Sequence, residues 1–327
     1  MADAAASLAI LLAEKHRREE ERATSTSHYQ ARFTELAASL RAQFHPKQRA
    51  AFRSMKPRVA IFSTRRGGKT SGGTHEMLAR LLETPNFRAV YAHETRDEGM
   101  KLAWRSDARD GLRDLVEQLN LSLARSYDEY IRNQSLDCLV NESKLSIDFR
   151  NGSQFIIFAA DKDSAADKFR GGEKNLIWVD EAQGFGPLSY FVNDVAAKTL
   201  AKPSGKLPGV MWVSGSPHPS LSGLFYEITR DPIKQGPRTP GWEVHEFSVV
   251  DNPYFGATRE ERWEATAGAE LVINGWDPAD PPAQFLREWG TPEGKVMWTV
   301  QDSMYVYCVH QKPPAEFAPV CVTADGY

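Results

Sequence analysis

Residues 59–73 read VAIFSTRRGGKTSGG, and this stretch decides the fold. An apolar run leads into a glycine-rich turn that ends in Gly68, Lys69 and Thr70, and a helix-like stretch, THEMLARLLE, follows directly. Backbone N–H groups at a helix N-terminus can hold phosphate oxygens, a lysine can reach the β- and γ-phosphates, and a threonine hydroxyl can ligate Mg²⁺. The stretch therefore predicts a P-loop that binds a nucleoside triphosphate, ATP, together with Mg²⁺.

The loop departs from the usual pattern at its first position. Ser63 stands where the opening glycine is usual, and two arginines precede the glycines. The loop residues that we expect to contact the nucleotide are Ser63, Arg66, Gly67, Gly68, Lys69 and Thr70. A guanidinium can stabilise the charge that develops on a transferring phosphoryl group, so Arg65 is a candidate catalytic residue.

Length and composition set the general class of the protein. The chain has 327 residues, enough for one large α/β domain with appendages or for two domains. A hydrophobic share of 41%, a charged share of 25% and a net charge of −3 are those of an ordinary globular protein. This net charge gives no overall nucleic-acid footprint, so any DNA contact must be local.

Cysteine usage and hydropathy bear on the compartment. Cys138, Cys308 and Cys321 form no CxxC pair, which argues against a disulfide framework or a zinc site. The apolar stretch at residues 4–13 is too short to span a bilayer and follows no basic segment. We therefore expect a protein of a reducing cytosol without a transmembrane segment.

The pattern of apolar runs predicts an α/β fold. Residues 33–52 read as helix on either side of a break at Pro46, and the stretch from Asp97 to Leu123 also reads as helix. The alternation of strands and helices along the chain indicates a mainly parallel, doubly wound sheet flanked by helices, with ligands at the carboxyl ends of the strands. Asn151 and Gly152 between two of the runs predict a hairpin. Beyond the P-loop strand, the predicted strands are RAVYAHE (88–94), KLSIDF (144–149), SQFIIFAA (153–160), NLIWVDEA (175–182) and GVMWVSGS (209–216).

Composition divides the chain into three parts. Residues 1–40 are expected to form an N-terminal helical arm, exposed or serving as a docking element, because charges of both signs occur there at helical spacing. Residues 41–245 form the expected P-loop ATPase core. Beyond Gly236 the sequence becomes rich in proline, tryptophan and glycine, so residues 246–327 are expected to form a small lid or linker subdomain.

Two adjacent carboxylates end the strand LIWVDE. Successive strand residues point in opposite directions, so Asp180 can face the metal while Glu181 polarises the attacking water. A strand that ends in Asp-Glu can also be no more than a solvated strand end. Its place after a P-loop, in a chain with this strand order, favours the catalytic interpretation.

A third element follows the strand GVMWV. Ser214, Gly215 and Ser216 lie where small hydroxyl residues can sense the γ-phosphate by hydrogen bonds and pass its loss to the next segment. The alternative is a plain turn rich in serine, glycine and proline.

Two further side chains are candidates upstream and downstream of the P-loop. Gln48 can both donate to and accept from an adenine edge, although a helix-cap or packing role is equally consistent with its chemistry. Arg170, beside a Gly-Gly hinge, can reach a partner subunit, whereas most arginines are solvated or paired on a surface.

Taken together, these motifs resemble the large terminase subunit, the DNA-packaging motor ATPase of tailed double-stranded DNA bacteriophages. The resemblance rests on an Arg-bearing P-loop with a non-glycine first position, an Arg-Gly element before LIWVDEAQ, and SGSPHPSLSGLFYE. DNPYF at residues 251–255 and the later PAQFLREWGTPEG resemble two further segments of that family. The resemblance covers residues 40–300.

The resemblance implies a role for each motif. Gln48 would read adenine, Lys69 and Thr70 would hold the phosphates and Mg²⁺, and Asp180 would support the metal. Glu181 would be the catalytic carboxylate, and residues 214–216 would couple hydrolysis to movement. Arg65 corresponds to the P-loop arginine of the family, and Arg170 to an arginine finger that acts on a neighbouring subunit.

The resemblance also implies a setting. The protein would move double-stranded DNA into a procapsid, as a homo-oligomeric ring, a pentamer, that contacts the portal protein and the small terminase subunit. It would work in the host cytoplasm, transiently at the portal vertex.

One feature departs from the family. Its members carry a C-terminal nuclease domain with clustered acidic metal ligands, and here Asp325 is the only residue that could begin such a cluster. We therefore expect no nuclease activity. Two alternatives stay open: a helicase-like nucleic-acid remodelling ATPase, which should bring a second sheet after residue 250, and a nucleotide-binding assembly protein that does not hydrolyse ATP.

Overall fold

The centre of the molecule is a single sheet. The computed structural model describes residues 29–161, 163–200, 208–219, 221–230 and 239–298. The expectations for residues 1–28, including the apolar stretch, and those for Cys308, Cys321 and Asp325 lie outside the described residues. Nine strands occur in the order β3-β4-β5-β6-β2-β7-β8-β1-β9. The strands are β1 (Arg58–Ser63), β2 (Arg88–His93), β3 (Leu123–Ala124), β4 (Cys138–Asn141), β5 (Ser146–Phe149), β6 (Gln154–Ala159), β7 (Leu176–Val179), β8 (Val210–Gly215) and β9 (Glu243–Phe247).

The sheet is mainly parallel, and its register brings the functional strand ends together. From β6 through β9 all neighbours run parallel, and β5 alone runs antiparallel to its neighbours β4 and β6. Phe62 at the end of β1 pairs with Gly215, and Val179 at the end of β7 pairs with Val213. The carboxyl ends of β1, β7 and β8 therefore lie along one edge, and the predicted α/β fold class is confirmed.

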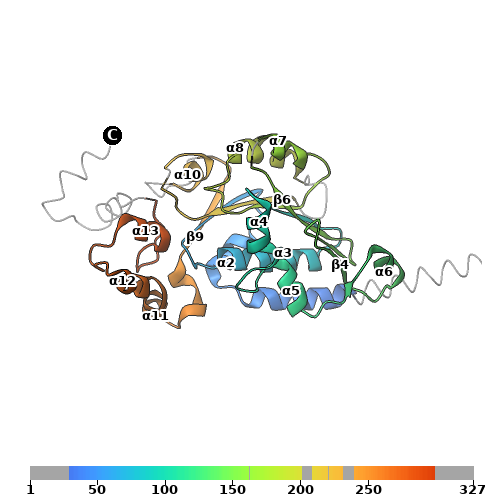
Figure 1. The fold of residues 1–327 in the computed structure, drawn as a ribbon, viewed down its shortest axis with the longest axis horizontal. Helices are drawn as coiled ribbons and strands as arrows, with labels where there is room; N and C mark the ends of the chain where they lie inside the picture. The colour runs from blue at the N-terminus through green and yellow to red at the C-terminus, as the bar shows by residue number, and fades with distance from the viewer. Residues whose placement is uncertain (1–28, 162, 201–207, 220, 231–238, 299–327) are drawn as a thin grey trace, which may run out of the picture.

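Helices cover both faces of the sheet. The chain is helical over residues 29–42, and Figure 1 shows α2, α3 and α5 on one face and α7, α8 and α10 on the other. In the core the helices are α2 (Pro46–Arg53), α3 (Lys69–Glu83), α4 (Arg96–Gly99), the π-helical η1 (Met100–Trp104), α5 (Leu112–Gln118), α6 (Tyr127–Arg132), α7 (Asp163–Ala166), the 3₁₀ turn η2 (Asp167–Phe169), α8 (Leu188–Tyr190), the π-helical η3 (Phe191–Ala196), α9 (Ala197–Thr199) and α10 (Leu224–Thr229). Since the central strands are covered on both faces, they read as continuous apolar runs.

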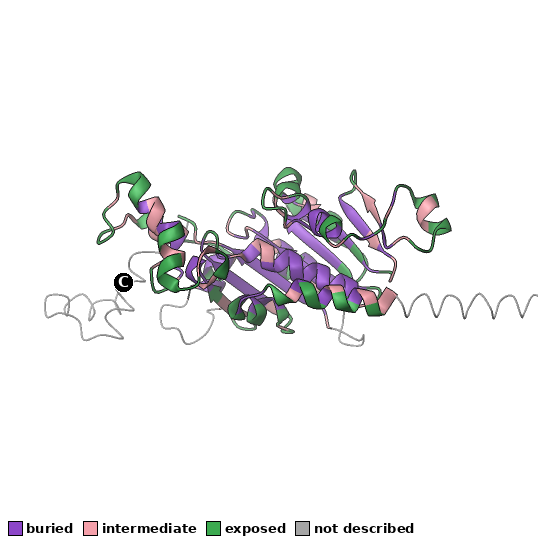
Figure 2. Cartoon of the chain, turned by 90° about the horizontal axis from the view of Figure 1, so that it is seen from below, coloured by how far each residue is buried: buried purple, intermediate pink, exposed green. Residues whose placement is uncertain are grey.

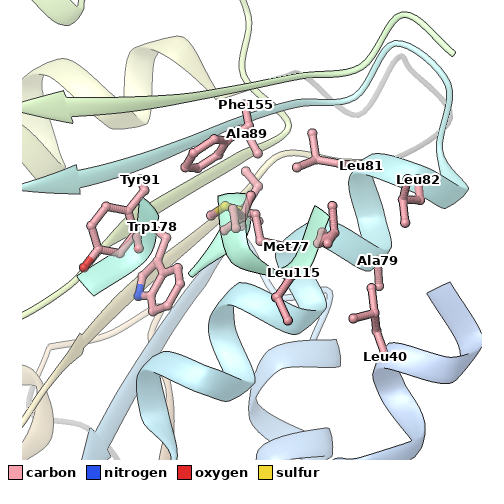
Figure 3. Close-up of a cluster of buried hydrophobic side chains, with 14 of the residues drawn as sticks. Leu40, Met77, Ala79, Leu81, Leu82, Ala89, Tyr91, Leu115, Phe155 and Trp178 are labelled. Carbon is pink, nitrogen blue, oxygen red and sulfur yellow. The ribbon is translucent and has the colours of Figure 1, made fainter. Parts of the chain in front are cut away.

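The α3 helix lies unusually close to the sheet. It is one of the most buried helices in Figure 2, and its side chains Met77 and Leu81 join the cluster shown in Figure 3 with Trp178 of β7. A Cβ at Gly73 would lie 2.1 Å from the Trp178 ring, well inside contact distance. Glycine at this position thus permits the close approach that fixes the start of α3 over β7.

A small helical subdomain occupies one end of the molecule (Figure 1). Its own core includes Val249, Leu271, Phe285 and Trp289. Its elements are the 3₁₀ turns η4 (Val249–Asp251) and η5 (Pro253–Phe255), the continuous helix α11 (Arg259–Trp263), η6 (Glu264–Gly268) and α12 (Ala269–Asn274), and α13 (Ala283–Trp289). We call residues 248–298 the lid subdomain.

Most of the predicted elements are present. The predicted strand runs contain β2, β5, β6, β7 and β8, and the predicted hairpin joins β5 to β6 through residues 150–153. The helix break is also found, since α2 begins at Pro46. No described helix has both the length and the apolar character needed to cross a membrane.

The helix predicted from Asp97 to Leu123 is wrong as a single element. Helix ends at Trp104 and resumes at Leu112, and Leu123 already belongs to β3. The intervening segment is rich in short polar side chains that bond the backbone instead: Ser106 Oγ accepts from the Asp110 N–H at 3.0 Å. Such local bonds compete with the helical hydrogen-bond pattern.

Three strands were not expected from the sequence. β3 and β4 are short, and β9 is an edge strand that pairs in parallel with β1. The predicted boundary near residue 245 falls within β9, whose sequence, EVHEF, has three polar residues among its five. At the other boundary, Phe33, Ala37 and Leu40 are buried in the main core.

Candidate nucleotide-binding and hydrolysis site

The loop between β1 and α3 has the geometry of a phosphate cradle. Gly68 occupies the N-cap of α3 with φ of +86°, a left-handed conformation that favours glycine. A Cβ there would lie 2.4 Å from Gln48 Nε2, and a Cβ at Gly67 would lie 2.3 Å from Ser63 Oγ. A 15-residue helix thus begins without a side-chain cap, leaving backbone N–H groups at its positive end for anionic oxygens.

Lys69 joins the P-loop to the end of β7. Its Nζ lies 2.9 Å from Asp180 Oδ1 and 2.5 Å from Glu181 Oε1. Burial by itself lowers the pKa of the lysine, but the two carboxylates more than offset this, and the net pKa is raised. Lys69 is therefore fully charged at neutral pH.

Asp180 is buried and is shared by several donors. Ser214 Oγ donates to its Oδ1 at 2.6 Å, and the hydroxyls of Tyr91 and Thr70 lie 3.1 Å and 3.4 Å from its Oδ2. Burial raises the pKa of the carboxyl, yet the Lys69 charge and the hydrogen bonds from Ser214, Lys69 and the Glu181 N–H hold it below its usual value. Asp180 is thus an ionised carboxylate in the interior. Burial, with the Asp180 charge as a smaller cause, raises the Tyr91 pKa well above 10, so the phenol is a donor.

The donor set suits Mg²⁺. Thr70 and Asp180 present hard oxygen atoms within 3.4 Å of each other. No cluster of three or more histidine, cysteine or acidic side chains that could hold a metal occurs in the parts of the chain that the structure describes. Mg²⁺ commonly takes only one or two ligands from protein and the rest from phosphates and water, so the residues present fit this ion.

Glu181 contacts the same Lys69 ammonium as Asp180 but is more exposed. Its φ of +50° turns the chain sharply after β7, and its side chain is 35% exposed. It borders a pocket of about 510 Å³ whose lining also includes His93, Glu94, Lys101, Gln183 and His218. The carboxylate therefore lies between the buried Lys69 and open space from which water can enter.

The segment 214–216 is tied to both carboxylates. Ser214 Oγ accepts from Trp178 Nε1 at 2.6 Å while it donates to Asp180. The Ser216 N–H donates to Gln183 Oε1 at 3.2 Å, and Gln183 in turn donates to Glu181. The structure thus brings this predicted element into the same hydrogen-bond network as Asp180 and Glu181.

Gln48 lies against the P-loop backbone. Its Nε2 donates to the Gly68 carbonyl at 2.7 Å, and its Oε1 accepts from the His45 N–H in the capping box of α2. The helix-cap interpretation of this glutamine is thus observed, and its contact with adenine stays a prediction.

The two loop arginines contact the lid subdomain. Arg65 Nη1 lies 3.4 Å from Glu288 Oε2, and its backbone N–H donates to the Glu288 carbonyl at 2.7 Å. The Arg66 guanidinium lies 5.4 Å from the centre of the Trp289 ring, and Asn252 Nδ2 donates to the Arg66 carbonyl at 3.0 Å. Both arginines thus link the phosphate loop to the lid subdomain.

Arg170 has a different set of partners. Its guanidinium lies 2.9 Å from Asp167 Oδ1, 3.0 Å from the Tyr190 hydroxyl and 3.4 Å from the Asp194 carbonyl. None of these partners belongs to the cluster of Lys69, Asp180 and Glu181. Positive φ values at Gly171 and Gly172 agree with a hinge-like turn beside it.

Three residues of the network were missed by sequence reasoning: Tyr91, Trp178 and Gln183. Tyr91 and Trp178 pair across β2 and β7, and their rings meet edge to face with centroids 5.0 Å apart. The order of strands, with β2 beside β7, was needed to find Tyr91. Asn252 was noted only as part of the DNPYF segment, and its bond to the Arg66 carbonyl was not predicted.

Comparisons with known proteins place this geometry in a wider context. No protein-family model matches the chain, and no curated protein matches it. Among solved structures, the ATPase domain of the large terminase of Thermus phage P74-26 superposes with a TM-score of 0.51 at 17% identity, over 76% of this chain and 92% of that one. The fold is that of large terminase ATPase domains.

A second terminase agrees. The large terminase of another thermophilic bacteriophage superposes with a TM-score of 0.52 at 16% identity, over 78% of this chain and 54% of that one. The chain thus spans about half the length of this second terminase. The terminase resemblance seen in the motifs is confirmed at the level of the fold, with a P-loop, a mainly parallel sheet and flanking helices.

Proposed function

We propose that this protein is an ATP-hydrolysing motor of viral genome packaging that moves double-stranded DNA into a procapsid. The observation that carries the proposal is the contact of Lys69 with Asp180 and Glu181, residues 111 and 112 positions later in the chain. The terminase ATPase fold supports the same conclusion. The chemistry of these three groups is that of phosphoryl transfer to water.

ATP is the substrate in this proposal. The N–H groups at the start of α3 and the Lys69 ammonium bind its phosphates, and Gln48 recognises adenine. Thr70 and Asp180 would hold Mg²⁺, which would neutralise charge on the phosphate oxygens. Ser63, Arg66, Gly67 and Gly68 shape the loop around the phosphates.

Glu181 acts on water. Its carboxylate accepts a proton as the water oxygen bonds to the γ-phosphorus, and the bond from that phosphorus to the bridging oxygen of ADP breaks. The products are ADP and inorganic phosphate, and the proton leaves Glu181 to solvent through the adjoining pocket. Arg65 and Arg170 stabilise the developing charge, Arg170 acting on a neighbouring subunit.

Coupling and partners complete the proposal. Ser214, Gly215 and Ser216 sense the γ-phosphate and pass its loss to the segment that follows them. The partners are double-stranded DNA, the portal protein, the small terminase subunit and further copies of the chain in a pentameric ring. The protein acts in the host cytoplasm at the portal vertex, and the domain limits at residues 40 and 245 belong to the same proposal.

The test is the substitution Glu181→Gln. The amide cannot accept the proton, so the rate of phosphate release should fall on the order of 10²- to 10⁴-fold, while ATP affinity changes little because Lys69 and the loop N–H groups remain. Phosphate release and binding of a fluorescent ATP analogue measure the two quantities. Glu227→Gln, an exposed glutamate on α10, serves as the matched control.

Two results would contradict the proposal. Undiminished hydrolysis by Glu181→Gln would show that another group activates water. ATP binding by the wild-type chain without phosphate release, even with DNA and portal present, would favour the nucleotide-binding assembly protein instead.

A further inference from the structure

Gln183 has both ends of its side-chain amide engaged. Its Nε2 donates to Glu181 Oε2 at 2.5 Å, and its Oε1 accepts from the Ser216 N–H at 3.2 Å. One glutamine therefore connects the proposed water-activating carboxylate to the segment 214–216. An amide suits this position because it supplies one donor and one acceptor at once.

The surrounding backbone is built around this side chain. A Cβ at Gly215 would lie only 2.0 Å from Gln183 Oε1, so the absence of a side chain at residue 215 makes room for the amide. A second bond runs beside it, from the Ala182 N–H to the Ser214 carbonyl at 2.9 Å. The turn at residues 181–184 and the end of β8 are thus joined by two hydrogen bonds.

Glu181 needs such a support. Its other carboxylate oxygen contacts the Lys69 ammonium. In the proposed function that ammonium also binds the phosphates. When Lys69 turns towards a phosphate, Gln183 is the described neighbour that still holds the carboxylate. A half-exposed glutamate without a fixed neighbour would populate several rotamers, and misplacement of a catalytic group by about 1 Å can cost on the order of 10²-fold in rate.

We propose that Gln183 is a positioning residue that sets the direction of the Glu181 carboxylate and links it to residues 214–216. The proposal rests on the proposed ATPase function. Through this link, a movement of Ser216 that follows loss of the γ-phosphate turns Glu181 away from the water position. Gln183 itself exchanges no proton with substrate.

Two substitutions of Gln183 and one control substitution test its hydrogen bonds to Glu181 and Ser216. Gln183→Ala removes both bonds. Gln183→Glu keeps an acceptor for the Ser216 N–H but places a carboxylate against Glu181. Gln154→Ala is the matched control, because Gln154 is exposed at the start of β6, at the opposite end of the parallel strands from the site.

The kinetic expectation is a split between kcat and KM. Both Gln183 variants should lose roughly 10- to 100-fold in kcat, with KM for ATP within about threefold of wild type, because the phosphate-binding groups are untouched. Gln154→Ala should match wild type. A Gln183→Ala enzyme with wild-type kcat, or with kcat intact and KM raised, would overturn the proposal.

A second measurement does not depend on turnover. Amide hydrogen exchange of the segment containing Ser216 should be faster in Gln183→Ala, since its acceptor is gone, and close to wild type in Gln183→Glu. Equal exchange protection at Ser216 in wild type, Gln183→Ala and Gln183→Glu would overturn the link between Glu181 and residues 214–216. If the wild-type chain bound ATP without hydrolysing it, the ATPase proposal would fail, and this exchange pattern would still decide whether Gln183 makes the link.

Discussion

At the scale of single residues, the site is organised around buried groups that keep one protonation state. Asp180 is ionised because Lys69 and three hydroxyls face it. The sequence was sufficient to predict Lys69, Asp180 and Glu181, because strand ends and loop glycines can be read from local patterns. It was insufficient for Tyr91 and Gln183, whose roles depend on which strands become neighbours.

Three buried or partly buried histidines make the stability of the fold depend on pH. Burial lowers the pKa of His45, His75 and His245 below the ordinary value of 6.5. As the pH falls below that value, the unfolded chain binds protons that the folded chain does not. The stability that these groups contribute is therefore present above about pH 6.5 and is lost as the pH falls towards their folded pKa values.

His75 offers a direct test of this pH dependence. Its Nδ1 contacts the Ser71 carbonyl at 2.8 Å within α3, and the ring meets Phe44. His75→Leu should reduce the slope of unfolding free energy against pH, between pH 7 and 5, by up to about 1.4 kcal/mol per pH unit. Urea denaturation at several pH values measures the slope. An unchanged slope would show that His75 titrates alike in both states.

At the scale of elements, two glycines without side chains determine the position of α3. Gly72 and Gly73 let the helix lie against the rings of Phe52 and Trp178, so the phosphate loop is held directly over β7. The helical pattern of residues 74–83 was readable from the sequence. The close approach was not, because two glycines near a helix start are also compatible with a flexible loop.

Gly73→Ala tests this packing. Alanine favours a helix over glycine by about 1 kcal/mol, but overpacking against an indole costs about 1–3 kcal/mol, so the variant should be destabilised. Denaturant unfolding gives the change. In a Trp178→Phe background, which removes the ring atoms nearest that Cβ, the added cost of Gly73→Ala should shrink. Equal costs in both backgrounds would contradict the close contact.

The lid subdomain shows a similar limit of sequence reasoning at the element scale. The DNPYF segment was recognised, yet its contact with the P-loop through Asn252 required the fold. The edge strand β9 was missed because three of its five residues are polar, unlike the continuous apolar runs of the central strands. It nevertheless connects the lid to the phosphate loop, where the Thr64 N–H donates to the Phe247 carbonyl.

At the scale of the whole molecule, Arg170 lies outside the cluster of Lys69, Asp180 and Glu181 in which we propose that ATP is hydrolysed. Arg170 is half-exposed and bound to Asp167 and Tyr190 on the face covered by α7 and α8. Exposed ion pairs of this kind generally contribute little to stability, so the guanidinium can exchange partners at small cost.

Mixed assemblies test whether Arg170 acts between subunits. Arg170→Ala and Glu181→Gln subunits should each be inactive alone, and mixing them should restore part of the ATPase rate, because some interfaces then combine an intact Arg170 with an intact Glu181. Steady-state phosphate release across mixing ratios measures this. Arg132→Ala, an exposed arginine of α6, is the control. Absence of any recovery would count against action in trans.

The bond between Trp178 and Ser214 has a spectroscopic consequence. The indole N–H is fixed by the Ser214 hydroxyl, and the ring is packed on Gly73 at the start of α3 and fully enclosed. Indole emission responds to the polarity and hydrogen bonding of its surroundings, so ultraviolet fluorescence that disappears with Trp178→Phe reports the state of the site. The protein thereby carries a native optical probe two hydrogen bonds from Asp180, and a stopped-flow trace of that emission would time each conformational step without any attached dye.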